Sequence, residues 1–299
     1  MYKAAVALLA AFFLMLLVIV LASESLLVIQ RIAHVSEVQG KVEYLNRQNG
    51  QWASLAEGMV VKAGTRLRTD ARGTATLTWS DGTKVKVGPD TILSVEKCFV
   101  KSGTSEEVSL FRLERGRVWT RVAKRLGQGA EFAVVTPVAV AGVRGTIFGV
   151  EARDGSAGPE SIVSVYEGQV ELQTTKGSKM VSSNEVAVVG KDGEVKLREQ
   201  QPEEISGWLE RKDLLLPMLV VTAPRNGEVV RNDSVAVGGR VETDARLTVN
   251  GAPAAPRPSG RFRVECKLRP GRNLIEVAAE DQSGRRTTHQ IEVVYRPAD

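Results

Sequence analysis

Apolar and polar residues alternate with a period of two along most of the chain beyond His34, and Gly, Asp and Asn punctuate the alternation. The clearest case is Thr74 to Val87, in which Ala75, Leu77 and Trp79 share one face, Ser80-Asp81-Gly82 forms a turn, and alternation resumes at Val85 and Val87. This pattern predicts a β-hairpin. Many such short segments, separated by turn residues, predict a mainly β protein.

The amino-terminal segment has a different pattern. Ala4 to Ala22 contains 19 residues without a charge, and a helix rising about 1.5 Å per residue would nearly match a hydrocarbon core of about 30 Å. We expect an uncleaved signal anchor that crosses the membrane once, and a helix that continues through Ser23 to Ala33 as a neck. A cleaved signal peptide is the alternative, because Val20-Leu21-Ala22 resembles a cleavage site.

A glycine stands two residues before a valine in three strand-like segments: Val38 to Val42, Glu114 to Val118 and Tyr166 to Val170. The separations between these glycines are unequal, which argues against a regular solenoid. Related corners between strands fit better, because glycine tolerates a bulge or a positive φ.

The β pattern ends with a hairpin in Glu185 to Leu197, and the polar run Glu199 to Glu204 follows. We therefore divide the chain into an anchor and neck (1–33), a β domain (34–199), a linker with a short helix (200–217) and a second β domain (218–299). The last part holds six or seven short strands, a pattern typical of an immunoglobulin-like β-sandwich. Within it, Asn250-Gly251 predicts a two-residue hairpin turn.

Composition narrows the possible functions. The chain of 299 residues is long enough for two or three domains, and its net charge of +5 comes from scattered Lys and Arg. This scattered distribution of charge does not indicate a protein that binds nucleic acid. Cys98 and Cys266 are the only cysteines and His34 and His289 the only histidines. Their spacing predicts no metal site, no cofactor and no Cys/His nucleophile.

Two groups of residues are candidates for binding. The first is a basic cluster that contains one acid, Glu114; its members are Arg112, Arg115, Arg117, Arg121, Lys124 and Arg125. A solvated strand face is one interpretation, and a site for an anionic partner, such as a lipid headgroup or wall polymer, is the other.

The second group lies in Thr136 to Val150, where β-branched residues surround a charged residue; its members are Thr136, Pro137, Arg144, Gly145 and Thr146. A charge among apolar neighbours normally has a partner. Arg144 is therefore either a structural ion-pairing residue or part of a partner surface. We favour the structural role and expect the stretch to be the closing core strand of the first β domain, leading into Val163 to Leu172.

Residues from about His34 to Leu197 resemble the FecR domain, the extracytoplasmic module of bacterial transmembrane regulators. The resemblance rests on several motifs in order: Gly58, Leu67-Arg68-Thr69, Gly73, Asp81-Gly82-Thr83, Leu113 to Val118, Thr136-Pro137, Val143 to Phe148 and Val165 to Val170. Founding members of that family carry a cytoplasmic anti-sigma domain and relay a signal from an outer-membrane receptor to a sigma factor. Only Met1 to Lys3 precede the expected helix here, so direct anti-sigma activity is not expected.

Residues 218 to 296 resemble bacterial immunoglobulin-like modules of the glucodextranase B type, found in surface proteins and beside carbohydrate-active enzymes. The matching elements are Val221 to Pro224, Gly227, Val249-Asn250-Gly251, Gly260-Arg261-Phe262, Leu268, Gly271, Asn273 to Ile275, Ala279-Glu280-Asp281 and Gly284. The match implies a fold and little about a ligand.

These observations lead us to expect a non-enzymatic adaptor that a single helix anchors in the bacterial cell membrane, with its bulk outside the cytoplasm. The FecR-like domain would bind a protein or a cell-wall polysaccharide. A sensory component of a FecR-type signalling system is the alternative. A third possibility is a glycosidase, which needs paired carboxylates; Asp70, Asp81 and Asp90 are candidates, although Asp is ordinary at β-turns.

Overall fold

The computed structural model describes residues 28–46, 49–101, 107–122, 130–143, 145–204, 211–242, 244–257 and 259–297. The expected anchor, Ala4 to Ala22, lies outside these residues. In the part of the chain that is described, no helix is long and apolar enough to span a bilayer. The chain is mainly β, as the alternating pattern predicts.

Strands β1 to β18 pair into one closed barrel that is built from two sheets. The first sheet has the order β4 (Trp52–Ser54), β3 (Val42–Leu45), β6 (Arg66–Thr69), β9 (Ile92–Lys101), β10 (Glu107–Arg121), β11 (Glu131–Val135), β12 (Val140–Val143), β15 (Gln169–Thr174) and β16 (Gly177–Ser182). Strand β1 (Val28–Gln30) extends this sheet by pairing with the end of β9. Neighbours are antiparallel, except that β10 and β11 are parallel.

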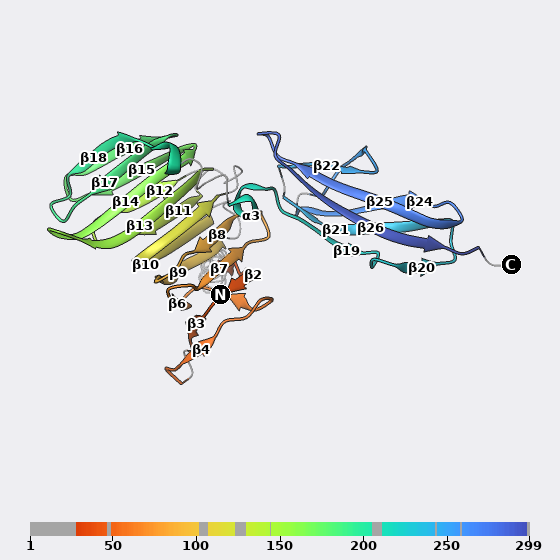
Figure 1. The fold of residues 1–299 in the computed structure, drawn as a ribbon, viewed down its shortest axis with the longest axis horizontal. Coiled ribbons are helices and arrows are strands. Elements are labelled where there is room, and N and C mark those ends of the chain that lie inside the picture. Colours follow the sequence, from red (N-terminus) through yellow and green to blue (C-terminus); the bar gives the residue numbers. More distant parts are fainter. Residues whose placement is uncertain are drawn as a thin grey trace, which may run out of the picture.

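The second sheet has the order β5 (Val60–Val61), β2 (Ala33–Gln39), β7 (Thr74–Thr78), β8 (Lys84–Val87), the end of β10, β13 (Ile147–Gly155), β14 (Gly158–Glu167), β17 (Glu185–Val189) and β18 (Val195–Glu199). Strand β10 therefore belongs to both sheets and ties them together near the middle of the barrel (Figure 1). The predicted hairpins β7–β8 and β17–β18 are confirmed.

The three predicted corner glycines stand where the chain passes from one sheet to the other. Gly40 joins β2 to β3, Gly116 divides β10, and Gly168 joins β14 to β15, and their φ angles are 64°, 89° and 91°. A Cβ on Gly40 would lie 2.6 Å from the carbonyl oxygen of Arg72. These positions need glycine for both its backbone angle and its small size.

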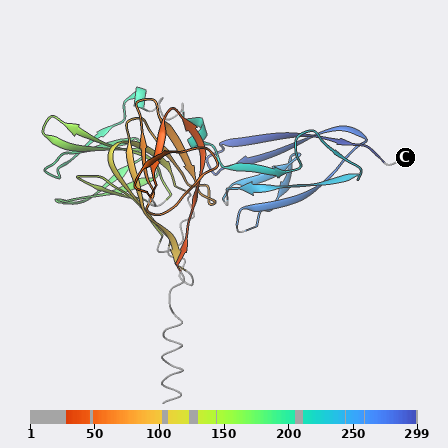
Figure 2. The ribbon, with the colours of Figure 1, turned by 90° about the horizontal axis from the view of Figure 1, so that it is seen from below.

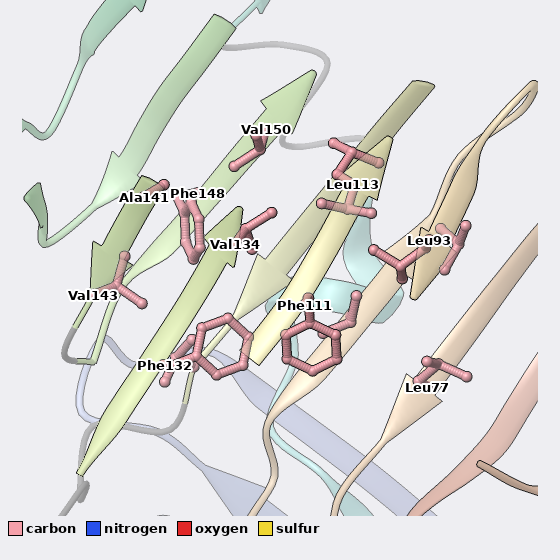
Figure 3. Packing of buried hydrophobic residues seen from close by; sticks show 14 of the residues in the cluster. Leu77, Leu93, Phe111, Leu113, Phe132, Val134, Ala141, Val143, Phe148 and Val150 are labelled. Carbon is pink, nitrogen blue, oxygen red and sulfur yellow. The ribbon is translucent and has the colours of Figure 1, made fainter. Parts of the chain in front are cut away.

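A chain of aromatic rings packs in the barrel core. Phe111, Phe132 and Phe148 lie side by side between the sheets (Figure 3), with ring centroids 5.1 Å and 6.3 Å apart. Trp79 adds an edge contact to Phe111 at 5.7 Å. All four rings are buried, so their burial contributes about 1.5–3 kcal/mol each to stability.

A linker with the short helix α3 (Lys212–Leu215) leads to the C-terminal sandwich. The buried Leu214 and Leu215 pack against Ile147 of the barrel. Arg211 places its guanidinium 4.0 Å from the centre of the Trp119 ring. The linker is therefore fastened to the barrel (Figure 1).

The sandwich consists of two sheets around a separate core. One sheet is β19 (Leu219–Ala223), β21 (Ser234–Val241) and β24 (Arg261–Lys267); the other is β20 (Glu228–Val230), β26 (Arg286–Tyr295), β25 (Gly271–Glu280), β22 (Arg246–Val249) and β23 (Ala252–Ala254). The turn at Asn250 and Gly251 has φ angles of 50° and 77° between β22 and β23. The predicted hairpin and immunoglobulin-like sandwich are confirmed. Figure 2 shows the sandwich extending away from the barrel.

Two predictions about the barrel are wrong. The expected helical neck ends in strand, because Val28–Gln30 pairs with β9 and Arg31 forms an ion pair with Asp81 at 2.5 Å. The stretch Thr136 to Val150 is not a single closing strand. It contains β12 in one sheet and the start of β13 in the other, and five more strands follow.

Candidate functional site

The residues of the Thr136 group that the structure describes have structural contacts. Thr136 Oγ1 donates to the Ala139 carbonyl at 2.9 Å and accepts from its amide at 3.0 Å, which closes the turn at Pro137 between β11 and β12. Thr146, fully buried beside Gly145, donates to the Gln169 carbonyl at 2.8 Å. Arg144 lies outside the described residues.

The basic cluster is divided among several faces of the barrel. Arg112 pairs with Glu96, and Arg117 pairs with Glu151, both at exposed positions, while Arg115 is also exposed. Lys124 and Arg125 lie outside the described residues. Only Arg121 is buried, so the cluster forms no common surface among its described members.

Arg121, at the end of β10, links the barrel to the sandwich. Its guanidinium lies 2.5 Å from a carboxylate oxygen of Glu242 and 3.3 Å from one of Asp281. The side chains of Arg121 and Glu242 are 7% and 1% exposed. A buried charge needs a partner with good geometry, so this network fixes the two parts of the molecule against one another. We call these three residues the lock.

Further contacts surround the lock. Gly82, in the β7–β8 hairpin with φ of 93°, packs so closely on the sandwich that a Cβ would lie 2.5 Å from Cγ of Glu242. Glu242 also accepts a hydrogen bond from the Met218 amide at 3.0 Å. Arg285 of the sandwich pairs with Glu167 of the barrel at 3.1 Å. The hairpin glycine thus permits the close approach of the two parts.

The two carboxyl groups of the lock differ in acidity. Burial raises the pKa of Glu242, and the attraction of Arg121 offsets this only partly. Burial acts on Asp281 in the same direction, but hydrogen bonds from the side chain and backbone of Arg285 outweigh it and hold the pKa of Asp281 below its ordinary value. Asp281 therefore loses its proton at lower pH than Glu242 does.

A groove of about 1140 Å³ opens beside the lock, between the barrel and the sandwich. Ligand sites commonly occupy such positions between domains. The barrel wall comes from β2, β7 and β8, with the hydroxyl groups of Ser36, Thr76 and Thr78 and the amine of Lys84. Leu216, Pro217 and Met218, at the end of the linker, also line the groove. The groove is thus lined by both parts of the chain.

The sandwich wall of the groove is basic. It is the outer face of the β19–β21–β24 sheet, and it carries Arg240, Arg261 and Arg263, with Arg257 from the loop before β24. We call these four residues the arginine wall. Among the described residues that line the groove, Glu37 is the only one with a carboxylate, and its oxygens are engaged by Gln39, Thr76 and Lys86 of the barrel. The groove can therefore accept an anionic group.

Candidate catalytic carboxylates have structural contacts in the barrel. Asp70 accepts from the Arg72 amide at 3.0 Å, and Asp81 accepts from the Thr83 amide at 3.0 Å while pairing with Arg31. Within the described residues, no group of three or more His, Cys, Asp or Glu is arranged to hold a metal. Cys98 and Cys266 are free and buried.

Sequence reasoning did not find Glu242, Asp281 or the arginine wall. Arg121 is 121 positions from Glu242 and 160 from Asp281 in the sequence, so no local pattern joins them. The spacing of Arg261 and Arg263 on alternate positions of one strand was the signal for a common basic face. Arg240 joins that face only through the pairing of β21 with β24.

Two family models match the chain. Residues 65–171 match the model described as FecR protein, and residues 217–296 match the model described as Glucodextranase, domain B. Both resemblances inferred from the sequence are thereby confirmed. No curated protein matches the chain.

Two crystal structures of a candidate anti-sigma factor from Parabacteroides distasonis ATCC 8503 align with the chain at 16% identity. The first alignment covers 75% of this chain and 98% of the other, with a TM-score of 0.40. The second covers 78% and 99%, with a TM-score of 0.39.

Proposed function

Because the chain carries a FecR domain at residues 65–171 and a glucodextranase domain B module at residues 217–296, we propose that it is an extracytoplasmic, non-enzymatic sensory component of a FecR-type signalling system. The FecR family implies a role in signalling between proteins of the cell envelope. The expected helix Ala4 to Ala22 would hold the chain in the bacterial membrane, with the barrel and sandwich outside the cytoplasm.

The observation that carries the proposal is the groove between the barrel and the sandwich. A partner bound there would contact both parts at once, beside the buried Arg121–Glu242 pair. Differential binding to two relative positions of the parts would shift their equilibrium. A signal could then pass from the sandwich to the barrel and its amino-terminal β1 strand.

Site-specific photo-crosslinking in intact cells tests this role. A photoreactive residue replaces Ser36 on the barrel wall or Thr222 on the sandwich wall, both lining the groove. The matched control replaces Leu274, which is 63% exposed and outside the groove. We expect both groove positions, and not the control, to capture the same envelope signalling protein.

A transcript comparison completes the test. Deletion of the gene should change the expression of genes that depend on one sigma factor. Unchanged transcripts, together with no shared crosslinked protein, would contradict the signalling role. Mass measurement of the mature amino terminus distinguishes a retained anchor from a cleaved signal peptide.

An envelope adaptor without a signalling role is the second candidate, and the glucodextranase domain B module favours it. In that case the chain would sediment with isolated cell-wall polymer and the transcripts would not change on deletion. Sedimentation with the polymer and unchanged transcripts would together replace the signalling proposal.

A further inference from the structure

The arginine wall gathers positive charge on the outer face of the β19–β21–β24 sheet. Arg240 and Arg261 stand directly opposite one another on β21 and β24, and Gly238 faces Arg263. None of the four arginines of the wall has an ion pair or side-chain hydrogen bond among the described residues. Like charges directly opposite in a sheet are destabilising, so the bound state of the groove should supply an anion.

Protection of a sheet edge does not account for this arrangement. Charged side chains on edge strands prevent unwanted pairing, and β24 is an edge strand of its sheet. However, Arg240 lies on β21, the central strand. In addition, the Arg257 amide donates to the Arg261 carbonyl at 2.8 Å, which places a further guanidinium-bearing residue beside the same strand.

The shape of the groove favours an extended peptide. Gly238, opposite Arg263, and Ala236, opposite Glu265, add little bulk to the sandwich wall, and a Cβ on Gly238 would meet nothing closer than 3.6 Å. The opposite wall carries the hydroxyl groups of Ser36 and Thr78, which share a hydrogen bond of 2.9 Å and keep further acceptor capacity. The two large aromatic residues in the groove, Trp79 and Phe262, are 2% and 5% exposed, so neither presents an open ring face for a sugar.

From this juxtaposition we propose that the groove binds an acidic, extended peptide segment of a partner protein, with its carboxylates on Arg240, Arg261 and Arg263. The guanidinium fork matches a carboxylate with two parallel hydrogen bonds, and the hydroxyl-bearing wall suits main-chain groups of an extended segment. A partner protein as the source of the segment follows from the proposed signalling role, whereas the charge preference of the groove does not depend on it.

Fluorescence anisotropy with the full chain in detergent tests the binding. The probe is a labelled octapeptide of alternating Glu and Val, and the comparison peptide has Gln in place of Glu. We expect the Glu peptide to bind at least about tenfold more tightly, with affinity that falls as salt rises. Equal binding of the two peptides would overturn the proposal.

Matched variants locate the site. The double variant R240Q/R261Q should weaken binding of the Glu peptide by about tenfold or more, whereas R246Q/R269Q, which removes the same number of exposed arginines of the sandwich outside the groove, should change it by less than about twofold. Equal losses in both variants would show nonspecific attraction and overturn the proposal.

A polysaccharide probe separates the alternatives. Polygalacturonate carries carboxylates on sugar rings. If it bound at the arginine wall more tightly than the Glu peptide, the ligand of the groove would be an acidic glycan, and the peptide proposal would be overturned. Binding of the Glu peptide, together with unchanged transcripts and no shared crosslinked envelope protein in cells, would support the charge preference of the groove and contradict only the signalling role.

Discussion

Arg121 and Arg117 lie on the same strand and both pair with a carboxylate, but their surroundings differ. Arg121 is buried between the barrel and the sandwich, whereas the Arg117 side chain is 47% exposed. Breaking a buried pair costs about 3–5 kcal/mol, since it leaves a charge without a partner, and an exposed pair contributes about 0–1 kcal/mol. We therefore expect R121M to lower the free energy of unfolding by several times more than R117M, as measured by urea denaturation. Similar losses in the two variants would show that the lock is not buried in solution.

Glu242 makes the stability of the lock depend on pH. Burial raises its pKa above the ordinary 4.5, so the folded chain binds this proton more tightly than the unfolded chain. The contribution of Glu242 to the free energy of unfolding should then decrease as pH rises from 4.5 through the raised folded pKa, and stay level above it. E242Q should remove the part of the decrease that Glu242 contributes, as measured by the urea midpoint from pH 4.5 upward.

Glu107 provides the comparison. Burial also raises the pKa of Glu107, and the attraction of Arg31 offsets this only partly. E107Q should therefore remove a second decrease of the free energy of unfolding with rising pH, which comes from the barrel. E107Q should keep the decrease of the free energy of unfolding that comes from Glu242. E242Q should keep the decrease that comes from Glu107. A wild-type pH profile in E242Q would mean that Glu242 is exposed to water in solution.

At the scale of elements, the crossing of β10 between the two sheets depends on Gly116. Its φ is 89°, and a Cβ would overlap Thr91 and lie 2.8 Å from the Asp90 carbonyl oxygen. The matched control is Gly177, with φ of 121° and nothing within 4 Å. G177A should cost about 1–2 kcal/mol from backbone strain alone, while G116A should cost about 1–3 kcal/mol more from overlap. Thermal and urea unfolding measure both, and equal losses would contradict a tight crossing.

Local patterns predicted the elements of this fold better than their arrangement. The period-two alternation found the β7–β8 hairpin, and the glycine before valine found the corners at Gly40, Gly116 and Gly168. The same reading joined β12 and β13 into one strand, because both are rich in β-branched residues and only the partners of each strand separate them. Local patterns could not predict the groove, since Arg240 and Arg261 meet only through strand pairing.

At the scale of the whole molecule, the lock should make the barrel and the sandwich unfold together. Each has its own core, so cooperation between them depends on the junction where Gly82 allows Glu242 to reach Arg121. In G82A the new methyl group would displace Glu242 without removing any charge. We expect one calorimetric transition for the wild type and two for G82A.

Gly58 is the matched control for that experiment. Its φ of 81° makes G58A strained as well, but no atom lies within 4 Å of the added Cβ. G58A should therefore lower the melting temperature and keep a single transition, because strain in a barrel loop does not touch the junction. If G82A also kept a single transition, contacts elsewhere would couple the two parts, such as Arg285 with Glu167. The coupling through Arg121 and Glu242 would then be redundant, and a partner in the groove would have to act on a junction held in more than one place.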